Sequence, residues 1–93
     1  MARYMTRVEL HGGTYTDYET LHKEMEAEGF ERTITSDDGK TYHLPTAEYY
    51  RNTSLERSQV LDSGKRAAGK TQKSYAIIVA EVLGMSWNGL AKL

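Results

Sequence analysis

The chain has 93 residues, which is enough for one domain with one layer of helices on one sheet. Hydrophobic residues make up 39% of it and charged residues 27%, which is ordinary for a globular chain and argues against disorder. The formal net charge of −1 argues against nucleic-acid binding driven by bulk charge, and the absence of cysteine excludes a disulfide framework and a cysteine-rich zinc site.

The first predicted element is a strand over residues 4–10. Side chains alternate in character: Tyr4, Thr6, Val8 and Leu10 share one face, and Arg3, Met5, Arg7, Glu9 and His11 share the other. This period of two, with one charged face, predicts a half-buried strand. The glycines at 12 and 13 then end it.

A helix is expected next. Thr16 and Glu19 have the spacing of a capping box with Thr16 as the N-cap, and Gly29 supplies the stop. Its stripe of residues at helical spacing is Tyr18, Leu21, His22 and Met25.

Residues 30–35 are rich in β-formers, and Ser36 to Gly39 form a strong turn signal, so a hairpin follows. Its second arm is expected to cover 42–44, to be interrupted at Pro45, and to resume as the third strand over 46–52. Within that strand, Ala47 and Tyr49 would share one face, and Glu48 and Tyr50 the other.

A second capping box, with Thr53 as N-cap, opens a helix to about residue 71. One stripe of this helix consists of Val60, Leu61, Gly64, Ala67 and Ala68. Residues 75–82 then form a buried strand, and residues 83–93 add a short strand or form a tail.

The predicted order is β-α-β-β-α-β, which favours a split βαβ arrangement in a single α+β domain covering residues 1–93. Right-handed crossovers place both helices on one face of a four-stranded antiparallel sheet, with strands one and three adjacent and central. The N-terminus is too polar for a signal peptide and the longest apolar run, residues 75–80, is too short to span a membrane. Together with the lack of cysteine, this indicates a cytoplasmic protein with no membrane partner.

The two helices carry opposite charge, and two interpretations of this stay open. Neighbouring helices of opposite charge attract one another while their outer faces are solvated. Alternatively, basic residues of the second helix and its end form a phosphate-binding patch, namely Lys65, Arg66, Lys70 and Lys73.

The sheet face without helices is the second candidate surface. Arg3 and Arg7 would take phosphates there and Tyr50 would stack on a base, as in small α+β domains that hold single-stranded RNA. The alternative is a solvated face with cross-strand ion pairs, such as Arg7 with Glu48.

Glu9 and His11 point the same way at the end of the first strand. RNA cleavage needs either a base for the 2′-hydroxyl proton, which suits histidine, or a metal-activated water, which suits a carboxylate holding Mg²⁺. The pair is a short pattern that many proteins carry on their surface, and no residue spacing in the chain is typical of a structural metal site.

Several strings of the sequence carry a family resemblance: residues 3–34, YHLPTAEYY at 42–50, a second amphipathic helix, and KSYAIIVAE at 73–81. In length and element order the chain resembles the small enterobacterial and prophage proteins grouped with GhoS, the antitoxin of type V toxin–antitoxin systems. This resemblance implies a ferredoxin-like fold akin to small CRISPR-associated endoribonucleases, and sequence-selective cleavage of a messenger that encodes a small membrane toxin.

The resemblance also implies roles for single positions. Glu9 matches an acidic residue near the end of the first strand, where the related ribonucleases usually have aspartate. GhoS relies on an arginine in its first helix, and at the approximate equivalent this chain has His22 followed by Lys23.

Two function hypotheses follow. The first is an antitoxin-like regulator that binds RNA, with no DNA preference implied, and cleaves it as an endoribonuclease through Glu9 and His11. The second is a non-enzymatic interaction module. Residues 75–80 are apolar on both alternations, which predicts that the open face is covered by the tail around Trp87 or by a second subunit in a homodimer.

Overall fold

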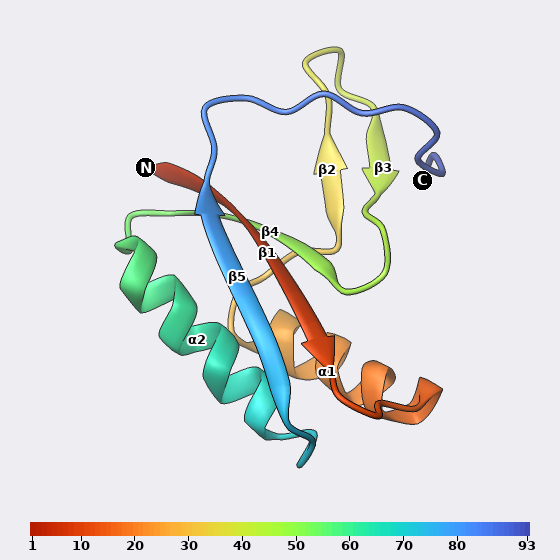
Figure 1. The fold of residues 1–93 in the computed structure, drawn as a ribbon. Coiled ribbons are helices and arrows are strands. Elements are labelled where there is room, and N and C mark those ends of the chain that lie inside the picture. Colours follow the sequence, from red (N-terminus) through yellow and green to blue (C-terminus); the bar gives the residue numbers. More distant parts are fainter.

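The structure, a computed structural model, describes residues 1–93. Its elements in chain order are β1 (Ala2–Leu10), α1 (Tyr15–Ala27), β2 (Thr33–Thr35), β3 (Thr41–His43), β4 (Glu48–Thr53), α2 (Arg57–Gly69) and β5 (Tyr75–Glu81). The fold is α+β, with an antiparallel three-stranded sheet of order β4-β1-β5 and a separate β2–β3 hairpin. Figure 1 shows the hairpin standing apart from the sheet, and the segment after β5 running across to it.

Strand β1 is the central strand, as predicted, and it pairs antiparallel with β4 on one side and β5 on the other. Strand β4, which was predicted to be central as well, is an edge strand of this sheet because β2 does not pair with it. The predicted alternation is confirmed, because Tyr4, Thr6, Val8 and Leu10 are buried while Arg7 and Glu9 are exposed. The register places Arg7 between Glu48 of β4 and Ile78 of β5.

Both helices pack against the buried face of β1. The core cluster joins Tyr4, Val8 and Leu10 of β1 to residues of both helices and to Phe30 and Tyr49; the helix members are Leu21, Met25, Val60, Ala67 and Ala68. Because side chains alternate along a strand, Arg3, Met5, Arg7 and Glu9 project from the opposite face. This second face, which carries no helix, is called the open face below.

Helix α1 begins two residues earlier than the sequence predicts. Thr14, not Thr16, is the N-cap: its Oγ1 accepts from the Asp17 amide at 3.2 Å, and Asp17 Oδ2 accepts from the Thr14 amide at 2.9 Å. Aspartate can close a capping box as glutamate does, and this option makes the helix start sooner after β1. The helix ends as predicted, with Gly29 following the C-cap at a left-handed φ of +99°.

Helix α2 begins later than predicted, at Arg57. Thr53 is the last residue of β4 and pairs with Ala2, so it cannot also be the N-cap. Its Oγ1 instead accepts from the Leu55 amide at 3.2 Å, and the helix is capped by Gln59, whose Oε1 accepts from the Glu56 amide at 2.8 Å.

The prediction of one four-stranded sheet is wrong. Glu31 and Tyr50 exchange two backbone hydrogen bonds, of 2.7 and 2.8 Å, but this bridge is isolated, and β2 goes on to pair only with β3. The cause is the turn after β3, in which the Glu48 amide donates to the Pro45 carbonyl at 3.1 Å and Ala47 takes a φ of +66°. Pro45 therefore does interrupt the ladder as expected, and it sends the two arms into different sheets.

The segment after β5 first adds one hydrogen bond to the main sheet, from the Val82 amide to the Arg3 carbonyl at 2.9 Å, and residues 83–93 then run to the hairpin. The His43 amide donates to the Ala91 carbonyl at 2.8 Å, the Leu93 amide donates to the Thr41 carbonyl at 2.9 Å, and Trp87 packs edge-on against Tyr42. The extra pairing predicted for 83–93 is present as one isolated bridge between Tyr42 and Lys92. Neither helix is long and apolar enough to cross a membrane.

Candidate nucleic-acid interface

The open face has an exposed end formed by the second half of β1. Arg7 and Glu9 are exposed, and no ion pair joins Arg7 to Glu48 although the two are cross-strand partners. The ion-pair interpretation of this face therefore does not describe Arg7. Its guanidinium, with five N–H donors, is available to a phosphate.

The structure brings Glu9 and His11 together at the end of β1 and adds Ser74. His11 Nε2 lies 3.6 Å from Glu9 Oε1, and His11 Nδ1 lies 3.4 Å from Ser74 Oγ. The His11 amide donates to the Ser74 carbonyl at 2.9 Å, which fixes the backbone of β1 against the start of β5. About half of the His11 side chain and two thirds of the Glu9 side chain are exposed, so both are open to a ligand.

The other end of the open face is a cleft, and it contains Arg3 and Tyr50. These two residues are diagonal neighbours, because Met5 pairs with Tyr50 and Arg3 pairs with Asn52. The cleft has a volume of about 470 Å³, and the hairpin and the segment after β5 form its remaining walls. Sequence reasoning predicted Arg3 and Tyr50 but not the cleft, since the hairpin was expected to lie in the plane of the sheet.

Trp87 lines the same cleft and was predicted only as a cover for the open face. A second cavity of about 250 Å³ lies next to it, lined by Met5 of the sheet, Leu44 and Pro45 after the hairpin, and Trp87 and Leu90 of the C-terminal segment. The C-terminal segment thus covers one end of the open face, whereas Ile78 of β5 stays 66% exposed.

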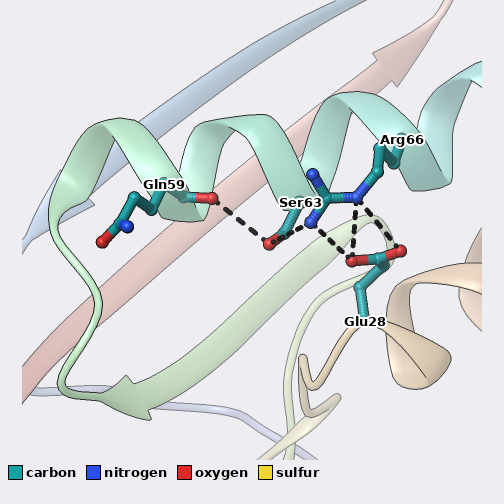
Figure 2. Close-up of polar contacts among 4 residues, drawn as sticks. All are labelled: Glu28, Gln59, Ser63 and Arg66. Atoms are coloured by element: carbon teal, nitrogen blue, oxygen red, sulfur yellow. Dashed lines mark hydrogen bonds and ion pairs between the residues drawn. The ribbon is translucent and has the colours of Figure 1, made fainter.

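The basic residues of α2 are arranged differently from the predicted phosphate patch. Arg66 donates through Nε and Nη2 to the Glu28 carboxylate, at 3.3 and 3.1 Å, and Nη2 also donates to Ser63 Oγ at 3.1 Å (Figure 2). Ser63 in turn donates to the Gln59 carbonyl at 3.2 Å. Arg66 therefore joins α2 to the end of α1, in agreement with the interpretation that the oppositely charged helices attract one another.

Two further basic residues complete this part of the surface. Lys73 Nζ lies 3.8 Å from Asp17 Oδ2, a second ion pair that ties the segment after α2 to the start of α1. Lys65 is exposed, and its ammonium group forms no ion pair or hydrogen bond; its carbonyl accepts a 3.4 Å hydrogen bond from the Tyr75 hydroxyl. Of the two predicted RNA contacts on this helix, Lys65 alone has an unpaired charge.

His22, which the sequence resemblance would set near the first-helix arginine of GhoS, lies in the core and is 6% exposed. Its Nδ1 is 2.7 Å from the Tyr49 hydroxyl. Burial lowers the pKa of His22, Arg32 adds to this effect, and burial raises the pKa of Tyr49, so both groups are neutral. A neutral, buried imidazole has no charge to offer a phosphate.

No three His, Cys, Asp or Glu side chains are grouped so that they could hold a metal ion. On the open face, Glu9 is the carboxylate next to His11, and Mg²⁺ bound there would need RNA phosphates for its remaining ligands.

The sequence matches no protein-family model, and no curated protein is significantly similar to it.

Proposed function

We propose that this protein binds single-stranded RNA on the open face of its sheet and serves as an antitoxin-like regulator of the GhoS type in the cytoplasm. The observation that carries the proposal is the placement of Arg7 on the central strand, exposed and without an ion pair, in line with the Glu9–His11 pair. Phosphates bind arginine, and RNA without a complementary strand presents them together with unstacked bases.

The proposal includes the finer fold assignment, a ferredoxin-like arrangement whose second strand has largely left the sheet. The isolated Glu31–Tyr50 bridge supports it, because this bridge extends the order β5-β1-β4 by a short piece of chain just before β2. A ferredoxin-like sheet has one face free of helices, which is the face proposed here for RNA.

RNA cleavage belongs to this proposal, with His11 as the base. If Nε2–H of a neutral His11 points to Glu9, Nδ1 is the free acceptor, and a 2′-hydroxyl would displace Ser74 from it. The 2′-oxygen gives its proton to Nδ1 and bonds to the adjacent phosphorus, the bond from phosphorus to the 5′-oxygen breaks, and this oxygen takes a proton from water. The products are a 2′,3′-cyclic phosphate and a 5′-hydroxyl.

RNA binding is tested by fluorescence anisotropy of labelled single-stranded RNA at several salt concentrations. With Arg3 and Arg7 as the phosphate contacts, the slope of log Kobs against log[salt] should be about −1.4, and Arg7→Ala should halve it and weaken binding roughly tenfold. Lys65→Ala removes the same charge from the helix side and should change neither quantity. If Lys65→Ala has the effect and Arg7→Ala does not, RNA binds to the helices and the proposal is wrong.

Cleavage is tested on the same RNA by gel electrophoresis and analysis of the fragment ends. Fragments with 2′,3′-cyclic ends should form in the presence of EDTA, and none should form with His11→Ala. With Glu9→Gln, the fragments should form more slowly. If EDTA abolishes cleavage, the reaction depends on Mg²⁺ held by Glu9 and not on His11 acting as the base without a metal. RNA that stays intact under all conditions, with binding retained, would leave a regulator that binds without cutting.

The competing candidate is an interaction module that forms a homodimer through β5. Its support is the 66% exposure of Ile78 on an edge strand that pairs only with β1. Residues 75–80 include no lysine or proline, the residues with which proteins blunt exposed edges.

A further inference from the structure

The cleft at the covered end of the open face has the size and the lining of a nucleotide site. Its volume is about 470 Å³, within the range of small-molecule sites in proteins. Tyr50 and Trp87 line it as half-buried aromatic rings, and Arg3 lines it as the only cation. Aromatic rings stack on bases of any kind, and an arginine binds the phosphate.

We propose that this cleft binds one unpaired nucleotide of the RNA, with its base against Tyr50 and Trp87 and its phosphate at Arg3. The inference rests on the proposed RNA binding and adds a subsite to it. Arg3 donates one N–H to the Leu83 carbonyl, which holds the start of the C-terminal segment, and its guanidinium has further donors for a phosphate.

The polar lining of the cleft selects among bases. Glu31 and Asp37 contribute carboxylates, which only accept hydrogen bonds, and Thr33 and Ser36 contribute hydroxyls. Carboxylates accept from the amino group of cytosine, whereas uracil has a carbonyl oxygen at that position. The cleft therefore prefers a base with an exocyclic amino group, and cytosine and uracil form a matched pair for testing it.

The cleft and the Glu9–His11 pair lie at opposite ends of β1. Arg3 and Glu9 are six residues apart, which corresponds to about 20 Å along an extended strand. An RNA that reaches both must be single-stranded and several nucleotides long, so a mononucleotide should occupy the cleft without reaching His11.

The experiment uses the fluorescence of Trp87, the only tryptophan in the chain, in the full-length protein. Titration with CMP should change this fluorescence, and UMP should need roughly tenfold higher concentrations for the same change. In the double variant Asp37→Asn/Glu31→Gln, the affinities for CMP and UMP should become nearly equal. Tyr50→Leu, which keeps an apolar side chain but removes the ring, should weaken the binding of CMP several-fold. Lys70→Ala should leave the binding of CMP unchanged.

Circular dichroism of each variant checks that it is folded. If labelled RNA binds in the anisotropy assay but neither RNA nor CMP changes Trp87 fluorescence, and Tyr50→Leu binds RNA like the wild type, the subsite is refuted while RNA binding stands. Equal affinity for CMP and UMP refutes the selection by carboxylates. Failure of all RNA to bind removes both proposals.

Discussion

At the scale of single residues, the buried pair of His22 and Tyr49 shows how a polar contact is kept inside a small core. Nδ1 of His22 and the Tyr49 hydroxyl are 2.7 Å apart, and Tyr49 is fully buried between His22 and Phe30. Such a hydrogen bond adds only about 1 kcal/mol to stability, but leaving either partner unpaired in the core costs more. The pair lies in the core, where it joins α1 to β4.

This pair predicts how stability depends on pH. Burial lowers the pKa of His22 below its ordinary 6.5; Arg32 lowers it further, and Glu19 and Glu26 oppose the shift. The unfolded chain then binds a proton that the folded chain does not, so the stabilising contribution is fully present above pH 6.5 and is lost as the pH falls through the lower pKa of the folded state. The urea concentration at the unfolding midpoint should therefore decrease when the pH is lowered from 7.5 to 5.5. The decrease should be smaller in His22→Gln.

The exposed His43 provides the control for this measurement, because only its backbone takes part in a hydrogen bond. His43→Gln should keep the pH dependence of the wild type. If the urea midpoint changes with pH equally in His22→Gln and in the wild type, groups other than His22 cause the pH dependence of stability.

At the scale of the elements, the packing of α2 against the sheet does not need the small residue at position 64 for close approach. Gly64 lies in the buried stripe of α2, between Phe30 and Ile77. A methyl group added there would lie 3.5 Å from Ile77 Cδ1 and 3.9 Å from Phe30 Cζ, which are ordinary van der Waals contacts. The glycine is therefore not required by the packing.

Gly64→Ala should raise the free energy of unfolding by roughly 0.5–1 kcal/mol, because alanine loses less backbone entropy in a helix and fills the space with a contact. Gly29→Ala is the opposite case, since its φ is +99° and the new methyl would lie 3.0 Å from the Arg51 guanidinium. It should destabilise by about 1–2 kcal/mol. Thermal unfolding of both variants checks this, and a destabilised Gly64→Ala would contradict it.

At the scale of the whole molecule, the two ends of the open face differ in accessibility. The hairpin and the C-terminal segment form clefts with the sheet at Arg3 and Met5, while the half of β1 with Arg7 and Glu9 stays exposed. The net charge of −1 is a sum over the whole chain, in which Arg66 and Lys73 are paired with Glu28 and Asp17 whereas Arg7 on the open face has no ion pair. Local placement, and not total charge, determines where a phosphate can bind.

The free edge of β5 leads to a prediction about oligomeric state. A second copy can pair antiparallel with β5 about Ile78, which would join two open faces side by side. Sedimentation should show dimers at high protein concentration, and Ile78→Lys should return the protein to monomers without loss of stability, because the side chain is exposed. Monomers in the wild type at high concentration would rule this interface out.

The sequence by itself determined the features that depend on neighbours along the chain. The alternation of β1, the buried stripe of α1, the stop at Gly29 and the break at Pro45 were predicted correctly. The stripe of α2 was predicted correctly except that Ser63 is buried and Leu61 only partly so. They follow from side-chain periodicity and backbone preference, which act over a few residues. The exposure of Arg7, Glu9 and His11 on one surface was predicted for the same reason.

Only the tertiary structure decided which elements meet. Helix α1 is capped by Thr14 because Thr14 and Thr16 are both suitable N-caps and Asp17 completes the box with Thr14. Helix α2 starts after Glu56 because Thr53 is the last residue of β4, where it pairs with Ala2. The hairpin left the main sheet because the turn at Pro45 redirects the backbone, and the C-terminal segment paired with the hairpin instead. The cleft at Arg3 is formed by three segments distant in sequence, so no local pattern could have predicted it.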